Sequence, residues 1–135
     1  MAATTLLTAS ITTAAAGVLG STFSGFSAAQ AMTFQAKFTY VASSATSVDA
    51  YIQTSLDGGL TWCDIAEFNF TTASATKTQN VSGMTVINAS ATVTDGTLTA
   101  NTSINGMLGD QLRVKYTSVG TYGAGTTLVI SAQPR

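Results

Sequence analysis

Apolar and polar residues alternate along much of this chain, the pattern of β-strands with one buried face. In residues 32–40 the apolar positions are Met32, Phe34, Ala36, Phe38 and Tyr40, and the positions between them are polar. Similar patterns predict strands at residues 48–53, 62–70, 111–117 and 128–132. We also expect strands in the less regular runs at residues 4–13, 84–87 and 92–94.

The breaks between these runs contain residues that favour turns. Asp57-Gly58-Gly59, Asp95-Gly96 and Asn105-Gly106 all tolerate positive φ angles. The only proline is Pro134, so no central strand loses a backbone donor. Short strands separated by such turns predict an all-β fold. We expect an antiparallel β-sandwich of about eight strands, jelly-roll or immunoglobulin-like.

The beginning of the chain differs from the rest in composition. It is rich in Ala, Thr, Ser and Gly, and the first charged residue is Lys37. We expect residues 1–27 to form an extended N-terminal arm, with a possible first strand and a Gly/Ala/Ser-rich segment, and residues 28–135 to form the β-sandwich domain. Removal of the arm is expected to abolish partner binding and leave the sandwich folded.

Three apolar residues of this arm are candidates for contact with a partner. They are Leu19, Phe23 and Phe26. Large apolar side chains on a flexible segment suit the groove of a neighbouring protein. The alternative stays open that the two phenylalanines cap the core of their own chain.

Charged residues are scarce along the whole chain. They make up 8% of it, with a net charge of −1 and no histidine, against about 25% in an ordinary domain. A chain so poor in acids, bases and nucleophiles is not expected to be an enzyme, and its single cysteine, Cys63, has no histidine to activate it. The surface polarity comes mainly from hydroxyl and amide groups, which are easier to desolvate than charges. Such a surface suits packing among subunits.

The same composition argues against nucleic-acid and membrane partners. The five basic residues are spread from Lys37 to Arg135 without a cluster, so we expect no direct contact with nucleic acid. The apolar stretch at residues 14–20 is far shorter than the roughly 20 residues that span a bilayer. We therefore expect no membrane partner.

The acidic residues do not form an obvious catalytic or metal-binding set. Asp64 and Glu67 are close in sequence, but residues three apart in a strand point to opposite faces unless a bulge intervenes. Asp57, Asp95 and Asp110 each lie beside a glycine, where capping of the turn backbone is the usual role. We predict no catalytic residue, no cofactor and no metal ligand; a calcium site in a loop stays open as an alternative.

One local motif matches a defined sequence pattern. Ser55, Asp57, Gly59, Thr61 and Trp62 match the S-x-D-x-G-x-T-W pattern of the Asp-box, a hairpin turn repeated in sialidases and also found singly in unrelated β-proteins. Asp57 is expected to accept hydrogen bonds from turn amides, and Trp62 to pack on the hairpin. A sialidase would need several copies and an arginine cluster, but this chain has one copy and two arginines. We interpret the motif as a structural hairpin.

Three segments resemble small β-sandwich structural proteins of tailed bacteriophages. They are Phe34-Gln-Ala-Lys-Phe38, the run from Val48 to Trp62 with Asp64-Ile-Ala66, and Leu108-Gly-Asp-Gln-Leu-Arg-Val-Lys115. The resemblance covers residues 32–135. It implies a virion protein on the capsid surface, most often a head decoration or cement protein. The implied partners are the major capsid protein and further copies of the chain itself, as in a trimer.

Two other functions stay open. The first, also implied by the resemblance, is a neck, head–tail connector or tail protein of the same virion. The second is a carbohydrate-binding module, because aromatic side chains can form a platform for sugars. The aromatic candidates are Tyr40, Tyr51, Tyr116, Tyr122 and Trp62.

Overall fold

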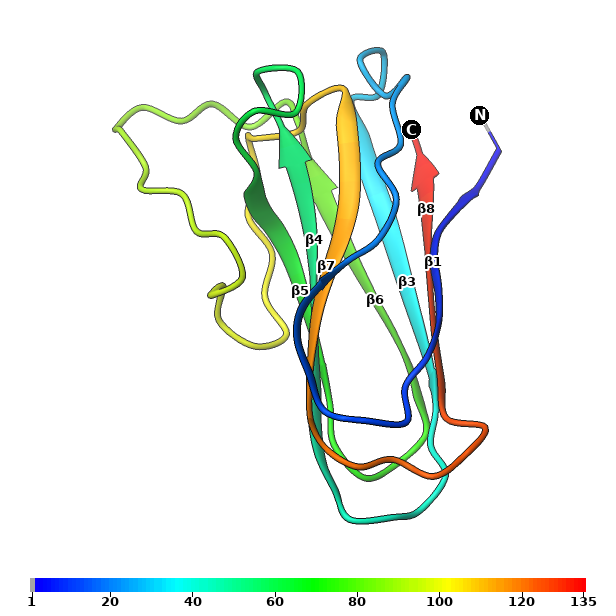
Figure 1. The fold of residues 1–135 in the computed structure, drawn as a ribbon. Helices are drawn as coiled ribbons and strands as arrows, with labels where there is room; N and C mark the ends of the chain where they lie inside the picture. Colours follow the sequence, from blue (N-terminus) through cyan, green and yellow to red (C-terminus); the bar gives the residue numbers. More distant parts are fainter. Residues whose placement is uncertain (1) are drawn as a thin grey trace.

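The computed structural model describes residues 2–135 as two antiparallel four-stranded sheets packed face to face (Figure 1). The strands are β1 (Thr4–Ser10), β2 (Ala15–Leu19), β3 (Ala31–Thr39), β4 (Ala45–Ser55), β5 (Cys63–Phe70), β6 (Ala75–Ser82), β7 (Gln111–Gly120) and β8 (Thr127–Pro134). Sheet A has the order β1-β8-β3-β6, and sheet B the order β2-β7-β4-β5. The predicted all-β antiparallel sandwich of about eight strands is confirmed.

The core lies between the two sheets and follows the alternation in the sequence. In β3, Met32, Phe34, Ala36 and Phe38 are all buried. The ring of Phe38 stacks on that of Phe70 in β5, with 5.0 Å between the ring centroids. Every second residue of the central strands therefore faces the opposite sheet, and the residues between them face outward.

Two of the expected strands are wrong. Residues 84–87 and 92–94 belong to a long loop, residues 83–110, between β6 and β7. Their β-branched residues favour strands, but in the described chain these two runs make one backbone hydrogen bond, from Asp64 N–H of β5 to the Thr94 carbonyl at 2.8 Å, and neither run forms a strand. Their places in the count are taken by the edge strands β2 and β6, in which few side chains are buried: none in β2, and only Val81 in β6.

The extended N-terminal arm over residues 1–27 is not confirmed. β1 pairs with β8 in sheet A, and β2 pairs with β7 in sheet B. Leu6, Ile11 and Phe26 are buried in the common core. Backbone pairing does not need strong side-chain alternation, so this Ala- and Thr-rich segment supplies an edge strand to each sheet. Met1 lies outside the described residues.

The position of β1 and β2 changes the expected result of a truncation. Deleting residues 1–27 removes two strands and three buried side chains, each of which contributes about 1.5–3 kcal/mol. We expect the truncated chain to lack a cooperative unfolding transition, as measured by circular dichroism during urea titration. A chain that begins at Thr4 is the control and should unfold like the full chain. Native-like unfolding of the long deletion would contradict this placement.

Candidate functional site: two unlike faces and an uncharged loop

The Asp-box hairpin between β4 and β5 is held together by its own side chains. The Asp57 carboxylate accepts a hydrogen bond from Thr61 N–H at 2.7 Å and one from the Ser55 hydroxyl at 2.9 Å. The Thr61 backbone donor, together with the Thr61 and Ser55 side chains, lowers the pKa of Asp57. Ser55 Oγ accepts from Gly59 N–H at 2.8 Å, and Trp62 Nε1 donates to the Gly59 carbonyl at 3.1 Å. All five motif residues therefore act within the turn.

Asp64 is a fully buried carboxylate that fastens the long loop to β5. Its Oδ2 atom accepts hydrogen bonds from the backbone N–H groups of Gly96 at 2.7 Å and Thr97 at 3.0 Å. The same oxygen accepts from Leu98 N–H at 3.2 Å and from the Thr94 hydroxyl at 2.8 Å. The backbone N–H of Asp64 donates to the Thr94 carbonyl at 2.8 Å. This carboxylate is thus committed to holding residues 94–98.

A β-bulge brings Asp64 and Glu67 to the same face. Tyr51 pairs with Glu67, but the register shifts beyond Ile52, so that Gln53 pairs with Asp64. Because Tyr51 and Gln53 are two residues apart in β4, they share the outer face of sheet B, and their partners share it too. The sequence left open that a bulge could turn Asp64 and Glu67 to one face of the strand, and this bulge does so.

Glu67 is a second buried carboxyl group beneath the loop. Its Oε2 atom accepts a hydrogen bond from Asn101 N–H, whereas Oε1 is buried with no hydrogen-bond partner in the described chain. Burial raises the pKa of Glu67 to about 7, and the nearby Asp49 carboxyl adds to this rise. Asn101 N–H and the Lys77 charge act in the opposite direction.

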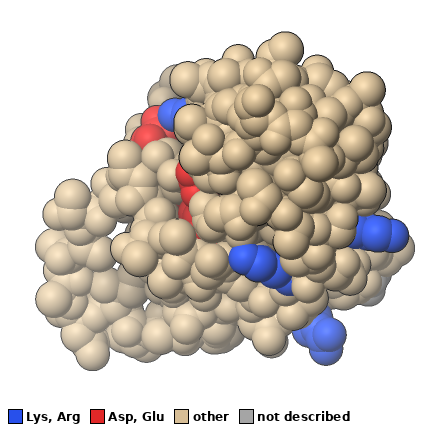
Figure 2. All heavy atoms as spheres, turned by 90° about the horizontal axis from the view of Figure 1, so that it is seen from below, with Lys and Arg blue, Asp and Glu red and all other residues tan. Residues whose placement is uncertain are grey.

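The remaining charges on the outer face of sheet B are linked by hydrogen bonds. Gln53 Nε2 donates to Asp64 at 2.8 Å and to Asp95 at 2.6 Å. Arg113 Nε donates to Gln53 Oε1 at 2.8 Å, and Lys115 forms an ion pair with Asp95 at 3.0 Å. In the view of Figure 2, acidic atoms form one narrow strip, and wide areas of the surface carry no charged atoms.

The outer face of sheet A is very different. Cross-strand rows place Thr33 between Asn80 and Gln133, and Gln35 between Thr78 and Ser131. The next row places Lys37 between Thr76 and Val129. Lys37 is the only charged residue among the outward positions of β3, β6 and β8. Hydroxyl and amide groups therefore dominate a broad surface.

The tip of the long loop, residues 84–93, is a second uncharged surface. All ten residues are exposed, and the apolar side chains of Met84 and Val86 are 68% and 76% exposed. No backbone hydrogen bond joins residues 85–93 to the rest of the described chain. Figure 1 shows this yellow-green segment projecting beyond sheet B. The tip therefore has exposed apolar side chains, and the backbone groups of residues 85–93 have no hydrogen-bond partner in the described chain.

The three residues predicted to contact a partner lie in different environments. Leu19, at the end of the edge strand β2, is 53% exposed. Phe23 is partly buried and forms an isolated bridge with Leu112. Phe26 is buried in the core, as the alternative interpretation of the phenylalanines requires. Of the three, Leu19 offers the most surface, and sequence alone did not indicate this difference.

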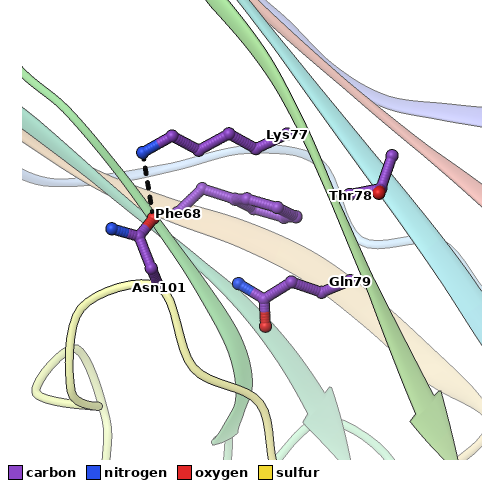
Figure 3. Close-up of a pocket in the computed structure, with 5 residues that line it drawn as sticks. All are labelled: Phe68, Lys77, Thr78, Gln79 and Asn101. Carbon is purple, nitrogen blue, oxygen red and sulfur yellow. Dashed lines mark hydrogen bonds between the residues drawn. The ribbon is translucent and has the colours of Figure 1, made fainter.

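A hollow of about 350 Å³ lies at the side of the sandwich where β5 and β6 do not pair (Figure 3). It is lined by Phe68, Lys77, Thr78, Gln79 and Asn101. Lys77 Nζ donates to Asn101 Oδ1 at 3.2 Å and lies 4.9 Å from the centroid of the Phe70 ring. The cation in this hollow is therefore already engaged by the protein itself.

The aromatic residues considered for a sugar platform do not share one face. Tyr122 is buried, packs edge-on against Tyr40 and donates from its hydroxyl to the Thr71 carbonyl at 2.7 Å. Tyr51 lies on the outer face of sheet B, whereas Tyr116 pairs with the buried Ala50 on the inner side. No common aromatic surface results from these positions.

Comparison of the chain with protein-family models, with curated proteins and with solved structures found no match. Within residues 2–135, no helix is long and apolar enough to cross a membrane. The same residues contain no group of three or more Asp, Glu or Cys side chains arranged to hold a metal ion.

The anchoring role of Asp64 predicts a large effect of Asp64→Asn. The new amide group would present hydrogens to the backbone N–H groups of residues 96–98, so we expect a loss of about 3–5 kcal/mol in the free energy of unfolding. Urea unfolding measures this loss, and limited proteolysis should cut residues 83–110 faster. Asp95→Asn is the control, because Asp95 is 55% exposed and its ion pair contributes under about 1 kcal/mol. Equal losses in the two variants would contradict the anchoring role.

The raised pKa of Glu67 predicts that stability falls as pH rises. The unfolded group titrates near 4.5 and the folded group near 7, so between these values the folded protein holds the extra proton. Stability should therefore decrease from about pH 4.5 to about pH 7 and then level off.

Glu67→Gln removes this titration and should flatten the pH dependence by up to about 3 kcal/mol. Urea unfolding at about pH 5 and about pH 8 measures the difference, and Lys37→Gln, an exposed change on sheet A, is the control. An unchanged slope in Glu67→Gln would refute the buried titration.

Proposed function

We propose that this chain is a non-enzymatic structural protein of a virion: a decoration or cement protein that binds and stabilises the major capsid lattice of a tailed bacteriophage. The observation that carries the proposal is the outer face of sheet A, which presents rows of hydroxyl and amide groups with one charge, Lys37. Neutral polar groups lose less on leaving water than charges do, and a partner can replace their hydrogen bonds. Such a face suits dense packing on a protein lattice.

The use of the acidic residues supports a role without catalysis. Asp64 and Glu67 hold the long loop, and Asp57 holds its own hairpin. Asp110 Oδ1 accepts hydrogen bonds from the backbone N–H groups of Gly25 at 3.2 Å and Ser27 at 3.0 Å. These carboxylates bind backbone donors of their own chain, as residues that shape a fold do.

A neck, head–tail connector or tail protein would need a similar neutral surface, and the number of copies separates it from a decoration protein. A decoration protein occupies equivalent positions over the whole capsid, whereas a neck protein occupies one ring. A quantitative gel of purified virions measures this number. Copies in proportion to the major capsid protein support decoration, and a ring-sized number supports the neck. Absence from virions contradicts both.

A charge placed on the outer face of sheet A tests the contact surface. We expect Thr78→Glu to weaken cosedimentation with capsids that lack the chain by at least about tenfold, because the interface would bury an unpaired carboxylate. Thr78 is exposed on an edge strand, so its replacement should leave the fold intact. Ser43→Glu, in the exposed turn between β3 and β4, is the matched control. Unchanged binding by Thr78→Glu would overturn the role of this face.

A further inference from the structure

We propose that Asp49 and Glu67 together bind a divalent cation, with calcium as the best fit, on the outer face of sheet B. The two residues are far apart in the sequence, so their spacing alone did not indicate a metal site. They belong to β4 and β5, whereas the neutral face assigned to the capsid contact belongs to sheet A. The cation site is therefore independent of the proposed function.

Strand pairing brings the two carboxyl groups together. Asp49 of β4 lies opposite Asn69 of β5, and Tyr51 lies opposite Glu67. Asp49 and Glu67 are therefore diagonal neighbours on the outer face of the sheet. Their carboxyl groups are within hydrogen-bonding reach of each other. Two carboxylates this close repel each other unless a proton or a cation lies between them.

Glu67 has a buried oxygen atom that no group of the described chain satisfies. The residue is 1% exposed. Its Oε2 atom accepts a hydrogen bond from Asn101 N–H, but Oε1 has no hydrogen-bond partner in the described chain. Buried polar atoms in folded proteins almost always have a partner, so an unsatisfied one points to a ligand. A cation bound at Oε1 would satisfy this atom.

No cationic side chain of the described chain forms an ion pair with these carboxylates. The charge of Lys77 acts on Glu67, but its ammonium group donates to the Asn69 carbonyl and to Asn101 Oδ1 (Figure 3). Within residues 2–135, neither Asp49 nor Glu67 takes part in an ion pair. Buried charges in proteins are paired or coordinate metal ions. A bound cation would supply the missing countercharge.

The atoms at this site favour calcium over other metals. They are all oxygens, and the chain contains no histidine, so the site suits a hard cation better than zinc or copper. Asn69 Nδ2 donates to Asp49 Oδ1 at 2.7 Å and holds this carboxylate in place. Asp49 is only partly buried, so water can complete the set of about six to eight oxygen ligands that calcium takes. Magnesium needs stricter octahedral geometry than two strand carboxylates impose.

A cation at this site would fasten the second half of the long loop. Asp64 already holds residues 94–98, and Asn101 N–H binds Glu67. Asn101 has a φ of 57°, the one positive value among the non-glycine residues of the described chain. Such a conformation persists where neighbouring groups hold it. A cation that fixes Glu67 would therefore keep Asn101 in place and the loop closed over β5.

Calcium titration of the full chain, freed of metal by a chelator, tests the site by calorimetry. The titration is done at about pH 8, because the pKa of Glu67 is about 7. We expect a dissociation constant of about 0.1–1 mM, the range of calcium sites with few charged ligands. Asp49→Asn and Glu67→Gln should each weaken binding at least about tenfold. Asp95→Asn is the matched control, since it removes the same charge beside sheet B from a carboxylate that pairs with Lys115.

Terbium luminescence gives a local readout of the same site. Terbium occupies calcium sites in proteins and emits light when a nearby tyrosine or tryptophan ring absorbs. Tyr51 lies opposite Glu67 and so is placed to excite it. We expect emission that added calcium abolishes and that Tyr51→Phe removes, while Tyr51→Phe leaves the calcium affinity unchanged.

Two results would overturn the cation site. One is the absence of calcium binding below about 10 mM, and the other is equal calcium affinity in Asp49→Asn and Asp95→Asn. If Glu67→Gln does not fold, Asp49→Asn decides, because Asp49 is only partly buried. Virions that lack the chain would contradict the proposed function alone, since calcium binding is measured on the isolated protein.

Discussion

The buried carboxylate of Asp64 is the interaction on which the surface of this protein depends. It gathers the backbone donors of residues 96–98 and fixes the long loop on the outer side of sheet B. Once the loop is fixed, Asn101 covers Glu67 and Asp95 meets Lys115. Burial of a carboxylate is costly unless donors replace the lost water, and here the loop backbone supplies them. One side chain thus determines both the path of the loop and the burial of its neighbours.

The consequence is a sandwich with two unlike sides. Sheet B uses its charged residues for internal bonds beneath the loop, while sheet A presents hydroxyl and amide groups with Lys37 as the one charge among its outward positions on β3, β6 and β8. The scarcity of charge in the sequence is therefore also a matter of placement. A neutral, regular face and an uncharged projecting loop are properties of proteins that pack against copies or a lattice. These surfaces support the proposed role in a capsid.

The central strands could be predicted from the sequence because they have one face in the core, as the alternation in β3 shows. β2 and β6 could not, since Val81 is their only buried residue, and residues 84–87 and 92–94 carry β-branched residues but form no strand. A bulge near Asp64 could be suspected from the polar residue in an apolar face. The donors that bind the Asp64 carboxylate, however, lie about 30 residues further along the chain, so only the folded loop reveals them. The raised pKa of Glu67 depends on burial beneath the same loop.

A reconstruction of the virion by electron cryomicroscopy tests the central claim most directly, because it shows which face of the chain contacts the capsid. We expect density for the sandwich at equivalent capsid positions, with the outer face of sheet A, around Gln35 and Thr78, against the major capsid protein. A sandwich bound to the capsid through another surface, with that face of sheet A open to solvent, would contradict it.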